Sequence, residues 1–471
     1  MLTNILNNRS FIYLFSKIFA ALINLFSIYI FTRLFNPEVY GSYLLFISYV
    51  VFLSYLIFGW HRSSIFRYFY KYKENYNSYI RTSYFSFYGL CLGLILLCLL
   101  ASFFFSYDNV RNIIILSAIG TLLRSNFDLN QSLFNISKYD NYYGIHIIIR
   151  PLLFIAICFI IYYIYPENNY SLIIGFIGSF LISIIYSNYF FQKHMLNSDF
   201  SYLIFKKFIS YGLPLTALFV FDYILTFSDR LFIGYYLGSN SVGIYGANYD
   251  FMKQILIFLM IIQNLIIYPD INKSYENNEL GKVNKLINLN FNIYLIIFLP
   301  LTIFLALFSD YISSILIGKN FIYSSNLLLP IFSFMFFIYG IKIFHFDYIF
   351  QLKEKTATSM KIVLVGSIIN ILLNIALIPQ FKLIGAAFST FLSFMICLLL
   401  SFFIGEKITK IKFKILIKVG SFVFISLMAS NLLRYFAFSN LLQMIIFVVV
   451  YLFLTIKYNF NIFLDYKNKF S

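Results

Sequence analysis

The chain has 471 residues, of which 61% are hydrophobic and only 11% are charged, and its formal net charge is +17 at pH 7. Soluble domains carry about 25% charged residues, so this composition excludes an ordinary soluble protein, and long continuous apolar runs exclude the alternating strands of a β-barrel. The basic residues lie in short segments between apolar runs, which is an orientation signal of membrane proteins and not a nucleic-acid-binding surface.

Fourteen apolar runs follow one another along the chain. Each is close to the roughly 20 residues that cross a hydrocarbon core about 30 Å thick. We therefore expect an all-α integral membrane protein with about fourteen transmembrane helices. The runs are, by residue number, 11–31, 40–59, 82–105, 112–133, 143–165, 170–191, 212–234, 247–268, 286–308, 327–350, 359–378, 385–405, 415–433 and 441–457.

The first and fourth runs need separate arguments. A single Arg precedes the first run and no small-residue cleavage site follows it, so we expect a retained span and not a removed signal peptide. The fourth run is interrupted by polar side chains that include Arg124 and Asp128, which argue against a simple span.

Lys and Arg accumulate in alternate connections between the runs. With the N-terminus placed in the cytoplasm, 24 of the 35 lie in cytoplasmic segments, five lie on the outer side and six lie in or near runs. This asymmetry predicts that both termini are cytoplasmic and that the number of spans is even. The five outer residues are Arg33, Arg111, Lys319, Lys382 and Arg434.

The sequence contains little that suggests catalysis or a metal site. The four cysteines lie inside apolar runs, and no pair has the spacing of a metal site or a disulfide framework. The longest polar stretches, 62–81 and 193–211, are short for an active-site domain, and neither a Gly-rich phosphate loop nor paired carboxylates occur in them. We expect no catalytic residues, no metal and no enzyme activity.

A short internal repeat suggests how the runs are grouped. A Gly-x-Tyr turn after the first run is matched by another after the seventh, and both fall on the outer side. That spacing suits six helices repeated as parallel bundles about an axis along the membrane normal, although two short Gly/Tyr turns can also match by chance. The expected parts are a six-helix bundle at 1–200, a second at 201–406, and two additional helices with a cytoplasmic tail at 407–471.

The segment 211–249 concentrates the most unusual features of the chain. A Gly-x-Pro opens an apolar run, an Asp and an Arg stand side by side near its end, and a Gly-rich turn follows. A charged side chain at the bilayer centre costs about 2.5–3.5 kcal/mol of insertion free energy, so such charges mark a transport pathway or an ion pair. The residues of this signature are Gly212, Pro214, Asp229, Arg230, Gly234, Gly238, Val242, Gly243 and Tyr245.

This signature resembles that of the polysaccharide-export branch of the multidrug/oligosaccharidyl-lipid/polysaccharide (MOP) exporter superfamily. That branch holds the Wzx-like O-antigen and capsule repeat-unit flippases. The segments 32–41 (TRLFNPEVYG) and 370–394 resemble the same family. For Asn370, Asn374 and Pro379 in the second segment we favour a structural role over ligand contact, because small residues let helices approach and Pro ends a helix.

The resemblance implies a flippase that moves an undecaprenyl-diphosphate-linked oligosaccharide across the bacterial inner membrane by alternating access. The cargo would be an O-antigen, capsular or exopolysaccharide repeat unit, which places the protein in polysaccharide or lipopolysaccharide biosynthesis. The implied partners are this lipid-linked glycan and membrane lipids, with a glycan polymerase and a chain-length regulator as further candidates and no nucleic acid. We expect no cofactor, and proton exchange, sodium exchange and membrane potential all stay open as energy sources.

A diphosphate headgroup needs cationic groups that replace water around it inside the membrane. Six basic residues lie in or near runs, and Arg150, which precedes Pro151, is expected near the inner face. The other five are expected to line a basic substrate cavity between the two bundles. They are Lys17, Arg124, Arg230, Lys253 and Lys342.

Each of these assignments has a structural alternative. Arg124 and Asp128 are spaced i,i+4 and Asp250 and Lys253 are spaced i,i+3, so each base has an acidic neighbour on its own helix face. Lys17 has no acidic residue within one turn and could instead extend to the inner interface.

Three further residues are candidates for ion coupling. Asp222 and Asp229 are spaced i,i+7 on one helix face, and His345 lies three residues after Lys342. A carboxylate or an imidazole could exchange a proton or bind a cation during transport. The alternatives are that Asp229 and Arg230 pair with neighbouring segments at a helix end and that His345 is a packing residue.

Two other functions remain open from the sequence. A multidrug or cation exporter of the related branch would need an acidic cavity, which the excess of basic residues in the runs disfavours. A membrane-embedded polymerase or ligase acting on the same lipid carrier would usually carry a larger external loop.

Overall fold

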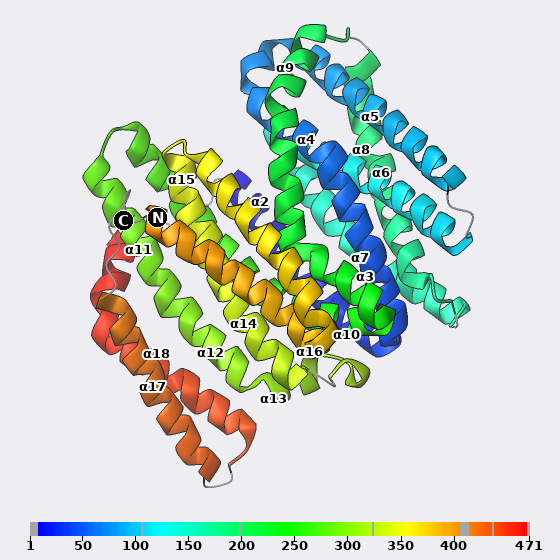
Figure 1. The fold of residues 1–471 in the computed structure, drawn as a ribbon. Coiled ribbons are helices and arrows are strands. Elements are labelled where there is room, and N and C mark those ends of the chain that lie inside the picture. The colour runs from blue at the N-terminus through cyan, green and yellow to red at the C-terminus, as the bar shows by residue number, and fades with distance from the viewer. Residues whose placement is uncertain are drawn as a thin grey trace. The chain divides into compact units, whose positions relative to one another are not determined.

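The computed structural model describes residues 8–104, 108–166, 168–196, 199–322, 325–405, 414–435 and 438–468. Every element in these ranges is a helix and none of them contains a strand, which confirms the all-α fold (Figure 1). Eleven helices in the described ranges are long and apolar enough to cross a membrane. The chain is therefore a multi-pass membrane protein.

Two of the long helices are each broken at one residue. In α10 (Thr216–Glu276) the backbone leaves the helical conformation at Gly238 (φ 80°), and in α16 (Thr356–Gly405) it does so at Lys382 (φ 52°). Each break separates two of the predicted runs. The fourth run does form a helix, α6 (Asp108–Ile136), but α6 is not among the eleven apolar helices. The expected number of fourteen spans stays a prediction.

The chain divides into two compact units after Gly243. We call the unit that spans Leu6–Gly243 the N-terminal unit and the residues from Ile244 on the C-terminal unit, and α10 contributes to both. The predicted division at 200 and 406 stays a prediction. The further helices of the N-terminal unit are α2 (Asn8–Leu34), α3 (Pro37–Leu53), η1 (Ser54–Phe58), α4 (Gly59–Tyr68), η2 (Tyr70–Asn75), α5 (Tyr76–Phe104), α7 (Asp140–Ile164), α8 (Ser171–Leu196), α9 (Tyr202–Gly212) and η3 (Leu213–Leu215).

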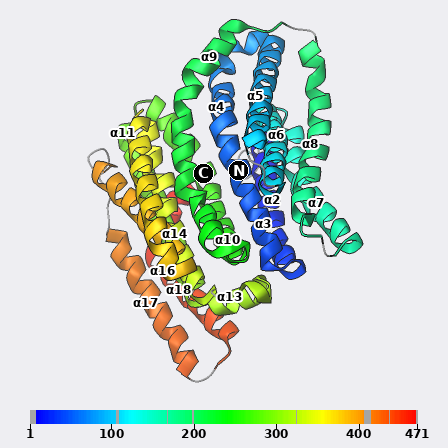
Figure 2. The same ribbon diagram turned by 45° about the vertical axis from the view of Figure 1, so that its right-hand side comes forward.

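The C-terminal unit begins with the second arm of α10 and ends with two antiparallel helices, α17 and α18 (Figure 2). Its described helices are α11 (Leu280–Ile293), η4 (Tyr294–Phe298), α12 (Leu299–Leu307), α13 (Ser309–Leu316), η5 (Lys319–Phe321), α14 (Ser325–Ile341), η6 (Lys342–Asp347), α15 (Tyr348–Leu352), α16, α17 (Lys414–Tyr435) and α18 (Asn440–Asn468).

The two Gly/Tyr turns of the sequence contact each other inside the N-terminal unit. A Cβ atom added at Gly41 would lie 1.8 Å from the carbonyl oxygen of Ser239, and one added at Gly243 would lie 1.9 Å from that of Pro37. Only glycine allows two backbones to come this close. Gly41 and Gly243 therefore have a packing role, whether or not the two turns belong to an internal repeat.

Local signals set the start of the neighbouring helix α3. Asn36 precedes α3, and its side-chain oxygen accepts a hydrogen bond from the backbone N–H of Val39 at 2.9 Å. Pro37 occupies the first position of α3, where its missing N–H costs nothing. The segment that resembles the exporter family is thus a helix cap followed by a close-contact glycine.

Three of the described helices contain a π-turn, at η1, η4 and η6. A π-turn changes the hydrogen-bond ladder to i→i+5 and leaves a backbone carbonyl in need of another donor. The Tyr451 hydroxyl donates to the Ile296 carbonyl of η4 at 2.5 Å, and the Tyr268 hydroxyl donates to the Phe344 carbonyl of η6 at 2.6 Å. Tyrosines from neighbouring helices therefore stabilise both irregular turns of the C-terminal unit.

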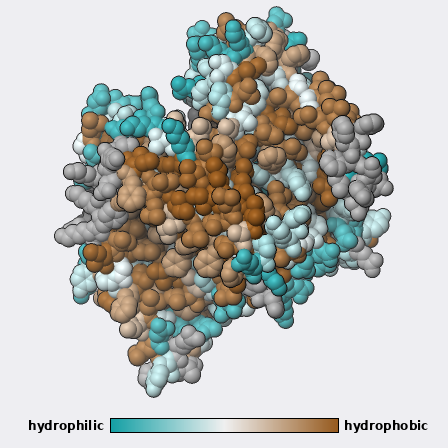
Figure 3. All heavy atoms as spheres, in the orientation of Figure 1, coloured by the Kyte–Doolittle hydropathy of each residue, from teal (hydrophilic) through white to brown (hydrophobic). Residues whose placement is uncertain are grey.

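Each unit has an aromatic core, and its outer faces remain apolar. In the N-terminal unit Tyr79, Phe134 and Phe191 are fully buried in one cluster. Over α14 and α16 the surface in Figure 3 is broadly hydrophobic, and α16 exposes side chains such as Leu372 and Phe403. Exposed apolar side chains on long helices are the expected surface toward lipid.

Candidate functional site

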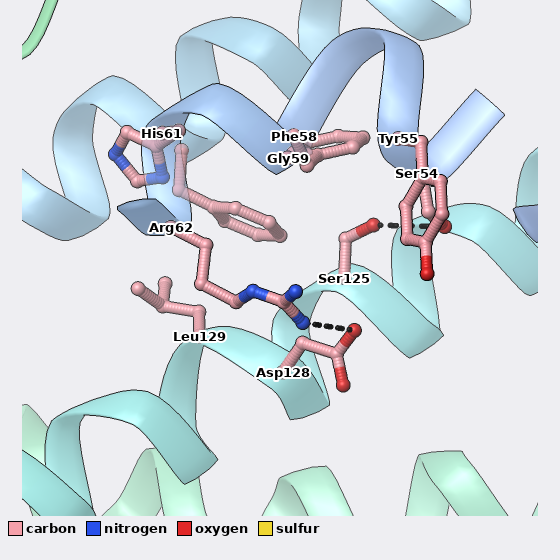
Figure 4. A pocket seen from close by; sticks show the side chains of 10 residues that line it. Ser54, Tyr55, Phe58, Gly59, His61, Arg62, Ser125, Asp128 and Leu129 are labelled. Atoms are coloured by element: carbon pink, nitrogen blue, oxygen red, sulfur yellow. Dashed lines mark hydrogen bonds and ion pairs between the residues drawn. The ribbon is translucent and has the colours of Figure 1, made fainter. Parts of the chain in front are cut away.

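The clearest group of charges lies in the N-terminal unit where α4 meets α6. The Arg62 guanidinium Nη1 lies 3.4 Å from Asp128 Oδ2 (Figure 4). The Arg124 Nε lies 3.9 Å from the same oxygen. The side chains of Arg62, Arg124 and Asp128 are 42%, 25% and 30% exposed. Two guanidinium groups therefore share a single, half-exposed carboxylate, and we call these three residues the arginine cluster.

A small cavity adjoins the arginine cluster. It has a volume of about 20 Å³ and is lined by Ser54 and Tyr55 of η1, by Ser125 of α6, and by Arg62 and Asp128 themselves. A cavity needs roughly 10–15 Å³ to hold one water molecule, so this one has room for a single water. In the conformation described, a sugar or a diphosphate does not fit inside it.

The positive charge extends beyond the arginine cluster. Arg150 of α7 interacts electrostatically with Arg124 and Asp128, and its Nη2 donates to the Asn24 side-chain oxygen at 3.5 Å. The Tyr55 phenol lies within electrostatic reach of the cluster and of Asp222. Arg150 thus belongs to the same charged neighbourhood as Arg124. Its expected position near the inner face stays a prediction.

The predicted pairing of Arg124 with Asp128 is present, but Arg62 was missed. We placed the second apolar run at 40–59, so Arg62 was predicted to lie in the cytoplasmic connection that follows this run. The structure instead continues the helix through the π-turn η1 and α4 to Tyr68. The apolar residues after Arg62, such as Ile65 and Phe66, are the signal that could have extended the run.

The remaining predicted basic residues lie in both units. Lys17 is half-buried with its Nζ 4.4 Å from the centre of the Tyr13 ring, and Arg230 is buried. In the C-terminal unit the Lys253 Nζ lies 5.9 Å from the centre of the Tyr249 ring. Each of these contacts is of the cation–π type. That these bases converge on one substrate cavity stays a prediction.

Lys342 has an acidic partner that helical spacing did not predict. Its Nζ lies 2.7 Å from Asp347 Oδ2, their side chains are only 3% and 11% exposed, and the Ser359 hydroxyl donates to Asp347 Oδ1 at 2.8 Å. Residues five apart lie about 140° apart around an α-helix of 3.6 residues per turn. The π-turn η6 brings them onto one face, because its hydrogen bonds join residues i and i+5.

The three coupling candidates have different surroundings. Asp229 is buried, and its Oδ1 accepts a hydrogen bond from the Arg230 backbone N–H at 3.0 Å, whereas Asp222 is half-buried on the same arm of α10. His345 is buried, with its ring 4.7 Å from Phe291 and 5.0 Å from Phe346. A role for any of them in ion coupling stays a prediction.

The second family-like segment joins the two arms of α16. The Asn370 amide donates to the Thr390 hydroxyl at 3.2 Å, and the Asn374 amide donates to the Asn370 side-chain oxygen at 3.0 Å. A Cβ atom added at Gly385 would lie 2.3 Å from the Leu377 carbonyl oxygen. These contacts support the structural role that we favoured. Among the described residues, no group of three His, Cys, Asp or Glu side chains could hold a metal ion.

Solved structures identify the class of fold. Over 95% of this chain and 99% of the other, the protein is similar to an inward closed lipid II flippase MurJ, with a TM-score of 0.76 and 16% sequence identity. An inward-facing multidrug resistance MATE family transporter of the MOP superfamily matches 82% of this chain and 94% of the other, with a TM-score of 0.64 and 14% identity. The protein has the all-helical fold of MOP-superfamily transporters.

Sequence comparisons identify the family. The chain belongs to the polysaccharide biosynthesis protein family, whose sequence model matches residues 30–326. It is 25% identical over 336 residues to the uncharacterized membrane protein MJ1068 of Methanocaldococcus jannaschii. It is 23% identical over 197 residues to the probable low-salt glycan biosynthesis flippase Agl15 of Haloferax volcanii. The matches cover 68% and 41% of this chain, and 66% and 40% of the relatives' own lengths.

Proposed function

We propose that this protein is a flippase for a lipid-linked oligosaccharide. Its family, its fold and the printed function of the Haloferax relative support a role in moving glycan precursors across a membrane. The observation that carries the proposal is the arginine cluster, which sets two guanidinium groups against one carboxylate in helices of a membrane protein. Charges in such segments are retained where they serve a substrate or ion pathway.

The chemistry of the cluster fits a diphosphate. Guanidinium groups form paired, charge-assisted hydrogen bonds with phosphate oxygens, and they lose less hydration free energy than an ammonium group does. The two contacts to Asp128, at 3.4 and 3.9 Å, are longer than the roughly 2.8 Å of a tight charge-assisted bond. Asp128 is thus an internal anion that an incoming diphosphate can displace without loss of a strong bond.

The finer proposal names the cargo and the route. The cargo is an undecaprenyl-diphosphate-linked O-antigen, capsular or exopolysaccharide repeat unit, which crosses the bacterial inner membrane while both termini stay in the cytoplasm. Transport follows alternating access of two helical units around a basic cavity. The protein uses no bound cofactor and draws on membrane potential or on proton or sodium exchange. A glycan polymerase and a chain-length regulator act on the delivered unit.

The test compares the two leaflets of the membrane. In a deletion strain of the native host, an impermeant label should find the lipid-linked saccharide accumulated on the inner leaflet. The wild-type gene and an Arg33→Ala control, which removes an exposed arginine of α2, should restore surface glycan. The Arg62→Ala/Arg124→Ala double variant should not restore it at equal protein level. Accumulation on the outer leaflet would favour a polymerase or ligase, and altered dye efflux without a glycan defect would favour a drug exporter.

A second double variant tests the wider basic cavity. Lys17→Ala combined with Lys253→Ala should abolish surface glycan at a normal protein level, since both lysines are proposed to hold the headgroup during transfer. Surface glycan measured by immunoblot is the readout. Normal glycan in this variant would remove both lysines from the substrate path and leave the arginine cluster as the proposed site.

A further inference from the structure

A second cavity, of about 210 Å³, lies within the C-terminal unit between the α12–α13 corner and the α17–α18 pair. We call it the outer pocket. Its polar lining consists of Asp310, Tyr311, Ser430, Asn431, Asn440 and Gln443.

The outer pocket lies at one end of this unit. Figures 1 and 2 both show α13, the C-terminal end of α17 and the N-terminal end of α18 at the same end, away from α11. The distribution of Lys and Arg assigns this end to the outer side, because the neighbouring connections contain only Lys319 and Arg434. In a flippase, a pocket at this end faces the leaflet that receives the cargo.

The lining chemistry differs from that of the arginine cluster. Among its described lining residues Asp310 is the only charged one, and the amides, hydroxyls and carboxylate can both donate and accept hydrogen bonds. A carboxylate in the lining disfavours an anionic phosphate. Leu307, Phe308 and Leu427 add an apolar wall. A polar rim beside an apolar wall suits an uncharged, hydroxyl-rich ring.

Two of the polar residues are buried, and one of them is held in place by a hydrogen bond. Ser430 and Gln443 are 4% and 7% exposed, and the Gln443 Nε2 donates to the Phe438 carbonyl oxygen at 2.8 Å. Amide and hydroxyl groups can take part in more than one hydrogen bond, so these residues at the wall of the cavity can also bond to a ligand. At about 210 Å³ the outer pocket is smaller than the roughly 300 Å³ of the smallest drug-sized sites. One sugar ring fits this size, and a whole repeat unit does not.

We propose that the outer pocket binds one sugar ring of the lipid-linked oligosaccharide on the outer side of the membrane. The inference rests on the proposed function and adds a glycan subsite separate from the site that takes the diphosphate. Asn431 and Asn440 contact the hydroxyl groups of the sugar ring, and the wall of the pocket formed by Phe308 covers the apolar face of the ring. The pocket thereby retains the glycan while the headgroup leaves the arginines.

Saturation-transfer NMR on the full-length protein in nanodiscs tests the pocket directly. The probes are free glucose, galactose, mannose, rhamnose and N-acetylglucosamine, offered to the wild type and to two variants. At least one sugar should receive saturation from the wild type. The Asn431→Leu/Asn440→Leu double variant should bind it about tenfold more weakly, the loss expected for about one hydrogen bond. The control Asn288→Leu, at a half-buried position of α11 outside the lining of the outer pocket, should bind as the wild type does.

The outcomes separate this proposal from the proposed function. No sugar signal from the wild type, or equal signals from the wild type and the double variant, would refute sugar binding in the outer pocket even if leaflet transfer is normal. Displacement of the sugar by phosphatidylglycerol in the nanodisc would also overturn it, because the occupant would then be a lipid headgroup. The flippase assignment is tested separately, by the leaflet distribution in the Arg62→Ala/Arg124→Ala strain.

Discussion

Replacing Asp128 with Asn should make the protein bind pyrophosphate more tightly. The change removes the negative charge that Arg62 and Arg124 share at 3.4 and 3.9 Å and keeps the size of the side chain. Both arginines then become available to an external anion. If Asp128 instead holds the arginines in position for the substrate, the same change should weaken binding, so the sign of the effect separates the two roles.

The expected size follows from the distances and the exposure. Two unit charges 4 Å apart attract by about 1 kcal/mol in water and by about 4 kcal/mol at an effective dielectric constant of 20. Because these side chains are 25–42% exposed, screening favours the lower figure, so each pair is worth about 1 kcal/mol. Releasing both should tighten pyrophosphate binding by about 1–2 kcal/mol, which is roughly five- to thirtyfold.

Calorimetric titration of the purified protein with inorganic pyrophosphate measures this change. Arg62→Ala/Arg124→Ala should lose the binding. Glu279→Gln, which removes an exposed carboxylate 3.1 Å from Lys282 in the C-terminal unit, should leave it unchanged. In cells Asp128→Asn should slow the appearance of surface glycan, because release of the headgroup becomes harder. Unchanged or weaker pyrophosphate binding by a folded Asp128→Asn protein would refute the idea that Asp128 competes with the substrate.

Two further predictions concern stability. Gly41→Ala places a Cβ atom 1.8 Å from a backbone oxygen, so it should destabilise the protein by about 1–3 kcal/mol. The control Gly93→Ala should not destabilise it, because its new Cβ atom meets no atom within 4 Å. Equal thermal unfolding midpoints for the two variants would contradict this prediction. Asp347→Asn should cost about 3–5 kcal/mol, because it leaves Lys342 buried without its counter-charge. The Lys342→Met/Asp347→Leu double variant should regain much of that stability in the same assay. If the double variant were less stable than Asp347→Asn, this prediction would be wrong and the ion pair itself would stabilise the fold.

Several features of the fold could be predicted from the sequence because they depend on local pattern. A run of about twenty apolar residues must satisfy its backbone hydrogen bonds internally in lipid, which leaves only the helix. The all-helical fold was predicted on this ground and is confirmed. The signature around Gly243 identified the family, and the close approach of its backbone to Pro37 explains why glycine is needed there.

The candidate site was only partly predictable. Arg124 and Asp128 are four residues apart on one helix, so their pairing follows from helical spacing. Arg62 comes from a different helix, 66 residues away from Asp128 in sequence, and no local pattern marks it as their partner. Lys342 and Asp347 were not paired because the prediction assumed an unbroken α-helix through a segment that forms a π-turn.

The sequence by itself determined that this chain is a helical membrane protein of the polysaccharide biosynthesis family with basic residues in its apolar runs. Composition and helical periodicity are properties of short stretches, so they need no knowledge of the fold. Only the tertiary structure decided which charges meet. Asp128 receives two arginines, Lys342 receives Asp347, and a polar pocket forms between α13 and α17–α18. Such pairs depend on where π-turns redirect helices and on which distant helices pack together, and neither is specified by spacing along the chain.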